Sequence, residues 1–151
     1  MLALGRHLIL EMWGCKNLNS VEIAERALRD MVDALGMHLL DLKVYPFTPI
    51  GVTGIAIVAE SHLVIHTWPE FGYAAVDVFT CGARSEPEAA VSVLRGHFAP
   101  DRVQAMEMTR GQLAAGRPAG GRSRARASRH ANEDASFSAA VAWVPPTALS
   151  A

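Results

Sequence analysis

Consecutive strand-like segments between two helix-like segments restrict the folds open to this chain. The helix-like segments span residues 21–35 and 89–98, where apolar side chains recur at helical spacing. Apolar or alternating segments typical of strands cover residues 6–13, 38–45, 52–59, 61–67, 73–80 and 102–109. Because four of these strands follow one another without an intervening helix, the order favours an antiparallel sheet with the helices on one face. The sequence therefore predicts an α+β fold.

Single residues near the ends and in the middle of these elements carry more detailed predictions. Asn19 or Ser20 stands at the N-cap position of the first helix, and Gly36 is placed to end that helix. Leu40 belongs to an alternating run of apolar and charged residues, which predicts a place on the buried face of a strand. Gly54 interrupts an apolar run, which predicts either a buried strand or a β-bulge.

The charge distribution divides the chain into two parts. Residues 1–109 carry 8 basic and 13 acidic side chains and residues 110–151 carry 6 and 2, so the balances are −5 and +4. Half of all residues are hydrophobic, which excludes a wholly disordered chain. The segment 116–130, GRPAGGRSRARASRH, has no apolar periodicity, so we expect it to be disordered. We therefore predict one domain over residues 1–112 and a basic, disordered tail over residues 113–151.

Several classes of protein are disfavoured by composition. The six arginines of residues 110–151 have no interleaved aromatic residues, which favours a solvated tail over a nucleic-acid-binding surface. There is no run of about 18 apolar residues to cross a membrane, and the N-terminus lacks a signal-peptide cleavage site. Cys15 and Cys81 cannot form a disulfide framework and are expected to be reduced thiols. We expect a cytoplasmic protein with no membrane and no nucleic-acid partner.

Residues 59–82 concentrate reactive side chains: two histidines, a serine, two glutamates, an aspartate, a tryptophan and a thiol within 24 positions. His62, His66 and Cys81 are all competent metal ligands. The segment has the character of a strand, however, and residues four apart on a strand are separated by about 13 Å. That distance is too long for one ion, so we expect no metal site.

Two other interpretations of this stretch stay open on spacing alone. Ser61 or Cys81 could be a nucleophile activated by His66, provided that folding brings them together. Alternatively, the histidines are hydrogen-bonded structural groups and the cysteine is an inert, small hydrophobe. The clustering of so many reactive residues weighs against the structural interpretation.

The same stretch resembles the S-adenosylmethionine decarboxylase proenzymes of the short bacterial and archaeal type. The family hallmarks ESH, IHTWPE, GYAA and FTCG all stand in order between Glu60 and Gly82. Residues 5–8 (GRHL) and 51–54 (GVTG) also resemble family segments. The resemblance covers roughly residues 4–112 and does not extend to the tail. It implies a two-layer α/β sandwich.

Self-cleavage between Glu60 and Ser61 is implied by this resemblance. The Ser61 hydroxyl would attack the Glu60 carbonyl to give an ester, and β-elimination would release a β chain of residues 1–60. The remaining dehydroalanine would hydrolyse to a pyruvoyl group at the head of the α chain, residues 61–151. Decarboxylation of an amino acid needs an electron sink, which the pyruvoyl carbonyl offers through a Schiff base with the substrate amine.

The resemblance also implies roles for individual residues. His66 corresponds to the histidine that assists processing as an acid or base, and Cys81 to the thiol that reprotonates the substrate carbon. A thiol, with an ordinary pKa near 8.5, suits a proton donor at neutral pH. Thr53 stands where the family often has serine, whose hydroxyl supports the processing intermediate; the threonine keeps that hydroxyl and adds a methyl group.

Substrate contacts are implied at four further positions. Phe47 and Trp68 correspond to aromatic residues near the adenine and the sulfonium, a cation that an aromatic face attracts by about 0.5–2 kcal/mol. Glu70 corresponds to a glutamate that binds substrate hydroxyls, and Glu11 is a candidate for the polar end of the substrate. For His62, a structural role is favoured over a catalytic one.

The implied assembly is a dimer of αβ protomers with sites near the interface, and the implied pathway is the synthesis of spermidine and other polyamines. Two alternatives remain at this point. One is a pyruvoyl decarboxylase of the same fold that acts on ornithine or arginine, because only the substrate pocket would differ. The other is a binding homologue that no longer processes, although the intact Ser61, His66 and Cys81 argue against it.

Overall fold

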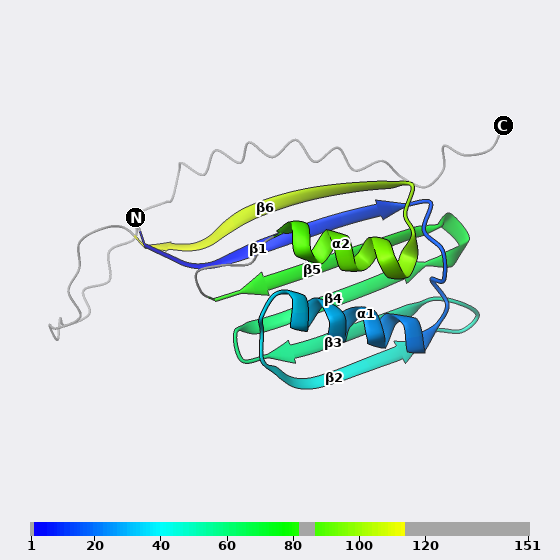
Figure 1. Ribbon diagram of the computed structural model, residues 1–151, viewed down its shortest axis with the longest axis horizontal. Helices are drawn as coiled ribbons and strands as arrows, with labels where there is room; N and C mark the ends of the chain where they lie inside the picture. The colour runs from blue at the N-terminus through cyan, green and yellow to red at the C-terminus, as the bar shows by residue number, and fades with distance from the viewer. Residues whose placement is uncertain (1, 82–86, 114–151) are drawn as a thin grey trace, which may run out of the picture. The chain divides into compact units, whose positions relative to one another are not determined.

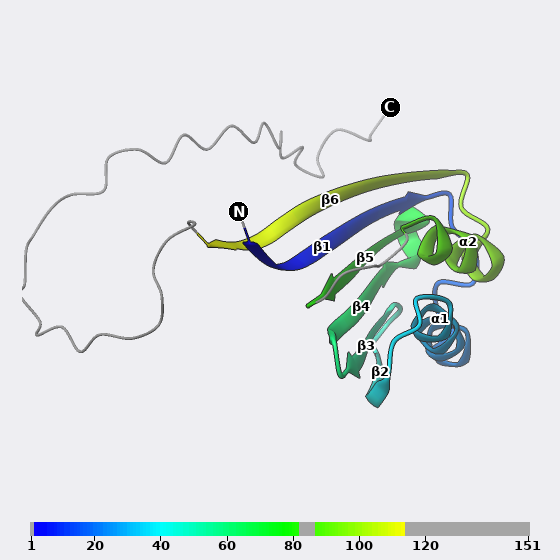
Figure 2. The same ribbon diagram turned by 60° about the vertical axis from the view of Figure 1, so that its left-hand side comes forward.

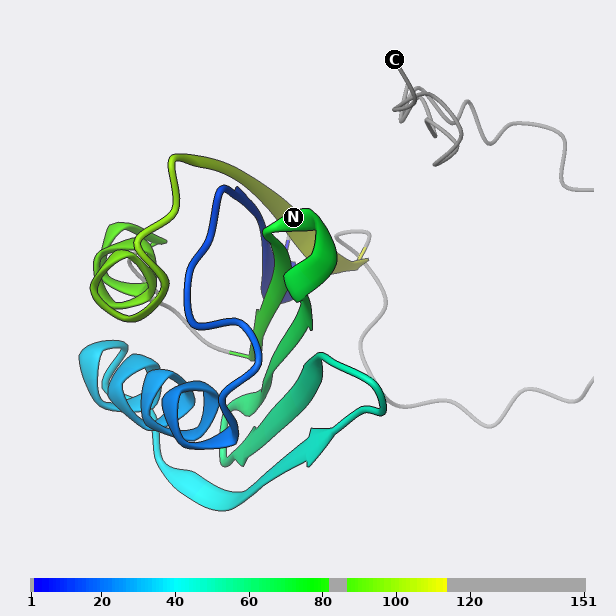
Figure 3. The same ribbon diagram turned by 90° about the vertical axis from the view of Figure 1, so that its right-hand side faces the viewer.

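Six strands form one antiparallel sheet, and both helices pack on the same face of it (Figures 1 and 3). The computed structural model describes residues 2–81 and 87–113. The strand order is β2-β3-β4-β5-β1-β6, so β4 and β5 lie at the centre. The elements are β1 (Leu2–Trp13), α1 (Val21–Ala34), β2 (Leu39–Pro46), β3 (Val52–Val58), β4 (Ser61–Trp68), the short 3-10 helix η1 (Pro69–Phe71), β5 (Tyr73–Thr80), α2 (Pro87–Phe98) and β6 (Arg102–Leu113). The predicted α+β fold, a two-layer α/β sandwich, is confirmed.

The last strand is longer than predicted, because β6 pairs with β1 as far as Leu113 instead of ending at residue 109. The basic tail predicted beyond the domain otherwise lies outside the described residues. Neither described helix has the length and apolar character needed to cross a membrane.

The ends of α1 show which predicted caps form. Ser20 is the N-cap, and its hydroxyl accepts a hydrogen bond from the Ile23 amide at 3.2 Å. Asn19, the other candidate, instead accepts a hydrogen bond from the Gly51 amide at 2.8 Å and so ties the loop before β3 to the helix start. Gly36 follows the helix with a φ of 64°, a conformation that glycine adopts without steric penalty.

Alternate residues of the central strands face the helices. In β4, Leu63, Ile65 and Thr67 are buried, whereas the even-numbered positions are only half-buried. Strands β3 and β5 alternate in the same way, and α1 lies over β2 and β3 with its apolar stripe inward. We call the opposite side of the sheet the open face, because no described helix covers it (Figure 2).

The prediction that Leu40 lies on the buried face of its strand is wrong. Leu40 is 67% exposed, although Leu42 and Val44 of the same strand pack against the core. The reason is a register shift between Leu39 and Asp41, which leaves Leu40 as an extra residue opposite β3. Such a bulge breaks the strict alternation on which the prediction was based.

Gly54 shows no bulge and instead permits close packing of the two layers. It pairs regularly with Val44 on β2. A Cβ at this position would stand 2.6 Å from Leu28 Cδ1 of α1 and 3.1 Å from Ile65 Cγ2 of β4. Glycine therefore sets how closely α1 approaches the sheet.

We expect Gly54→Ala to lower the free energy of unfolding by about 1–3 kcal/mol, because Leu28 and Ile65 are fully buried and cannot move aside freely. Urea unfolding followed by circular dichroism measures the change. Gly96→Ala on α2 is the matched control, since nothing lies within 4 Å of its new Cβ; it should stabilise by about 0.5–1 kcal/mol. A Gly54→Ala protein as stable as the parent would contradict this packing argument.

Candidate active site

The turn between β3 and β4 brings Glu60, Ser61 and Cys81 together. Ala59 and Glu60 form a two-residue turn, so that Val58 pairs with Ser61. On the other side, β4 pairs with β5, and this register places Ser61 opposite Thr80. As a result, the Cys81 amide donates a hydrogen bond of 2.8 Å to the Glu60 carbonyl. The pairing of β4 with β5 thus brings together predicted residues that lie 20 positions apart.

The backbone at Ser61 is in a rarely occupied conformation. Its φ is 147°, in the region that side-chain-bearing residues seldom adopt. The Ser61 hydroxyl lies 3.1 Å from Nδ1 of His62, the neighbour for which the sequence favoured a structural role. His62 also lies against Phe79, with ring centroids 5.7 Å apart. The histidine beside Ser61 in this chain is therefore His62 and not His66.

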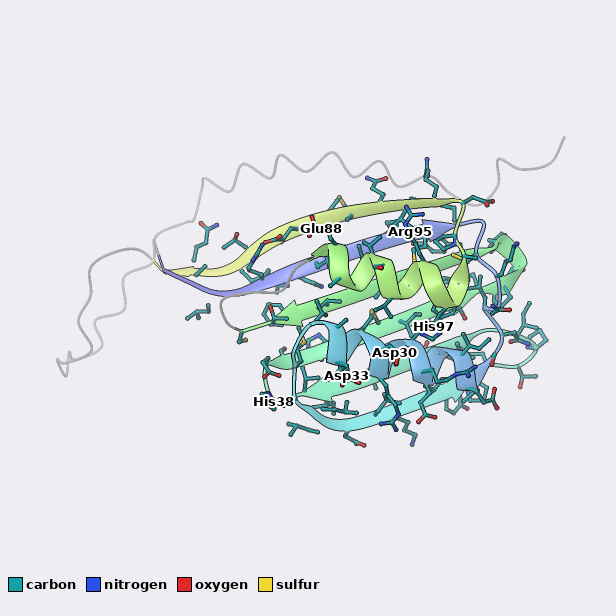
Figure 4. The ribbon with its side chains drawn as sticks, viewed as in Figure 1. Asp30, Asp33, His38, Glu88, Arg95 and His97 are labelled. Atoms are coloured by element: carbon teal, nitrogen blue, oxygen red, sulfur yellow. The ribbon has the colours of Figure 1, made fainter. Side chains whose placement is uncertain are left out.

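A residue that the sequence did not single out holds the Glu60 side chain. The Glu60 carboxylate accepts hydrogen bonds from the His38 amide at 3.1 Å and pairs with His38 Nδ1 at 2.7 Å. These two contacts keep the pKa of Glu60 below its ordinary value. His38 lies between α1 and the start of β2, at the same end of the strands as the β3–β4 turn (Figure 4). No motif marked it, because the contact spans 22 positions.

The other predicted residues meet at the far end of β4. His66 pairs across the strands with Thr53, and the two side chains are hydrogen-bonded. The His66 ring lies 4.0 Å from the Trp68 ring and 5.6 Å from the Phe47 ring, centroid to centroid. Burial lowers the pKa of His66 below the ordinary 6.5, while the carboxylate of Glu70 acts in the opposite direction. Glu70 itself is exposed on η1.

Glu11 joins this second group through a tyrosine that the sequence did not predict. The Tyr73 hydroxyl donates a hydrogen bond to the Glu11 carboxylate, and the Tyr73 ring stands 5.2 Å from that of Trp68. Burial and the contact with Glu11 both raise the pKa of Tyr73. Glu11, Tyr73, Trp68 and His66 thus form one continuous set of contacts on the open face.

Within one chain, the residues at the β3–β4 turn and the residues around His66 stay apart. Ser61 and His66 are five positions apart on one extended strand, which corresponds to about 16 Å. The other thiol, Cys15, lies apart from the turn, and burial raises its pKa to about 11, which suits an inert group. Of the two cysteines, only the exposed Cys81 contacts the turn.

Comparison with known proteins agrees with the motifs. Residues 6–111 match the family described as S-adenosylmethionine decarboxylase. A protein from Thermomicrobium roseum named S-adenosylmethionine decarboxylase proenzyme is 56% identical over 114 residues, which are 75% of this chain and 98% of that protein. A protein of the same name from Methanococcus vannielii is 47% identical over 113 residues, 74% of this chain and 93% of the relative.

The fold is similar to a solved relative as well. The crystal structure of the adenosylmethionine decarboxylase from Aquifex aeolicus superposes with a TM-score of 0.70 at 31% sequence identity. The superposition covers 78% of this chain and 99% of that one. The resemblance predicted from the motifs is confirmed.

We expect nuclear magnetic resonance titration of His66 to give a pKa below 6.5, because burial disfavours the imidazolium. Glu70→Gln should lower the pKa further, since it removes the carboxylate that favours the charged ring. Both results mean that the ring is neutral at pH 7 and able to accept a proton. A His66 pKa above 6.5, or one that rises in Glu70→Gln, would contradict this account.

Proposed function

The chain belongs to the S-adenosylmethionine decarboxylase family, and we propose that it cleaves itself between Glu60 and Ser61 to form the group on which its activity depends. The activity is the conversion of S-adenosylmethionine to its decarboxylated form and CO₂, a step of polyamine synthesis. Enzymes of this family use a pyruvoyl group made from an internal serine, and that carbonyl supplies the electron sink for decarboxylation. The family assigns S-adenosylmethionine as the substrate in preference to ornithine or arginine.

One observation carries the proposed cleavage site: the Cys81 amide donates a hydrogen bond to the Glu60 carbonyl beside the unusual Ser61 backbone. When the Ser61 hydroxyl adds to that carbonyl, negative charge develops on the Glu60 oxygen. A backbone donor held at 2.8 Å from this oxygen stabilises the charge as an oxyanion hole does. Residue types and geometry at the turn therefore fit the formation of the catalytic group from Ser61.

Backbone strain at Ser61 favours the same bond. A φ of 147° costs about 1–3 kcal/mol in a residue with a side chain. Cleavage of the Glu60–Ser61 bond removes this torsion, because residue 61 then begins a new chain. The strain is present before the cut and absent after it, which lowers the barrier to cleavage relative to an unstrained turn.

The neutral His66 suits the step that follows the acyl shift, in which a base removes the proton that drives β-elimination. Its hydrogen bond to Thr53 orients the ring, and Phe47 and Trp68 flank it. The same aromatic side chains offer faces to the adenine and to the sulfonium cation. Glu70 and Glu11 are placed around this group to bind polar parts of the substrate. After cleavage, we assign the role of proton donor to Cys81, whose amide contacts the Glu60 carbonyl beside residue 61.

These roles require a second copy of the chain, because His66 lies about 16 Å along the strand from Ser61. We infer a two-fold dimer in which the open faces pack together and β4 of one copy runs antiparallel to β4 of the other. His66 of each protomer then serves Ser61 of its partner. The open face suits such contact, since it exposes the apolar side chains of Tyr45, Phe47, Ile55, Ile57, Met106 and Met108.

Under denaturing conditions, we expect the mature protein to give two chains, of 60 residues and of the remaining 91. Ser61→Ala should give one uncut chain, because the nucleophile is absent. Cys81→Ala should still be cut, because its amide remains, yet it should lose decarboxylation by on the order of 10²–10⁴-fold. Intact mass and CO₂ release from S-adenosylmethionine measure the two properties. An uncut parent chain would refute the proposed processing.

The composite site is tested by expressing Ser61→Ala and His66→Ala together. Alone, the first stays uncut and the second is cut far more slowly than the parent. In a mixed dimer, the His66→Ala chain supplies Ser61 and its partner supplies the intact His66, so we expect the His66→Ala chain to be cut. A failure of the mixed dimer to cut would count against two-chain sites, as would rapid cutting of His66→Ala alone.

A further inference from the structure

We propose that His38 is a positioning residue for self-cleavage, which holds the Glu60–Ser61 bond in place through the Glu60 side chain; the inference rests on the processing proposed above. His38 lies in none of the quoted motifs and is not among the site residues that the resemblance implies. It contacts the residue on the amino side of the bond to be cut, at the opposite side of the turn from Cys81.

His38 makes three contacts with the turn, and together they use both its backbone and its ring. Its Nδ1 pairs with one Glu60 carboxylate oxygen at 2.7 Å, and its amide donates to the other at 3.1 Å. Its carbonyl accepts a hydrogen bond of 2.9 Å from the Ala59 amide. Two of the three contacts bind the Glu60 side chain, and the third is a backbone hydrogen bond to Ala59, the residue before it.

These contacts complete a set of restraints on Glu60. The Cys81 amide, just after β5, binds the carbonyl oxygen of Glu60. His38, just before β2, binds the Glu60 carboxylate. With both ends of the residue held, its peptide plane cannot rotate freely away from the Ser61 hydroxyl. Orientation of reacting groups is a large part of the advantage of an intramolecular reaction, so loosening one restraint should slow the acyl shift.

The His38 ring itself adds little to the core. Its side chain is 80% exposed, whereas the Glu60 side chain that it contacts is 29% exposed. Removing an exposed ring should leave the stability of the sheet nearly unchanged. The rate of cleavage and the stability of the fold can therefore be separated by experiment.

The experiment follows cleavage of the full chain with time after cell-free synthesis, by intact mass. We expect His38→Ala to be cut about five- to tenfold more slowly than the parent, because only the backbone contacts to Glu60 remain. His38→Asn should be cut within about twofold of the parent rate, since its side-chain amide can donate to the carboxylate as Nδ1–H does. If His38 had only a structural role, His38→Asn would not restore the cleavage rate that His38→Ala loses.

His97→Ala is the matched control. It removes another histidine–carboxylate pair of 2.7 Å, between His97 on α2 and Asp30 on α1, which lies between the two helices and away from the turn (Figure 4). This variant should be cut at the parent rate. The inference is overturned if His38→Ala is cut at the parent rate, if His38→Asn is as slow as His38→Ala, or if His97→Ala is equally slow.

A second measurement tests whether His38 acts through Glu60. In the background of Glu60→Ala, the replacement of His38 by alanine should cause no further slowing, because the contact is already absent. Full slowing in that background would overturn the inference. If the parent chain itself stays uncut, the proposed processing fails. If the parent chain is cut and His38→Ala is cut at the same rate, the processing stands and only the inference about His38 fails.

Discussion

The antiparallel pairing of β4 with β5 determines where the chemistry of this chain can occur. Because Ser61 pairs with Thr80, the next residue, Cys81, meets the carbonyl that precedes Ser61. One backbone hydrogen bond thus links the bond that we propose is cut to Cys81, the residue proposed to act later as the proton donor. A slip of one residue would turn the side chains of β4 to the opposite faces of the sheet and remove this contact.

The length of one strand is the physical reason for the second copy that we propose. Ser61 begins β4, and His66 lies five positions further along the same extended backbone. A strand rises about 3.3 Å per residue, so no side-chain rotation can close the gap within a protomer. The proposed antiparallel arrangement of two copies would bring opposite ends of the two β4 strands together, and the apolar side chains exposed on the open face offer the surface for it.

The layer of helices works mainly as support for the turn and the sheet. Gly54 lets Leu28 of α1 approach the sheet closely, and Asn19 at the helix start binds the Gly51 amide in the loop before β3. The segment between α1 and β2 then delivers His38 to the β3–β4 turn. The segment that connects the helix layer to the sheet therefore also places a polar side chain beside the proposed cleavage site.

The order of elements, the cap at Gly36 and the reactive motifs follow from the sequence alone, because periodicity, caps and motif residues are local properties of the chain. The bulge that exposes Leu40 and the contact of His38 with Glu60 depend on how distant strands align. Spacing along the chain carries no record of that alignment. The sequence by itself therefore determined the fold class and the family, and it singled out the residues that we propose to react. Only the tertiary structure decided which of them meet within one chain, because the register of β-strand pairs is set by packing across the whole sheet.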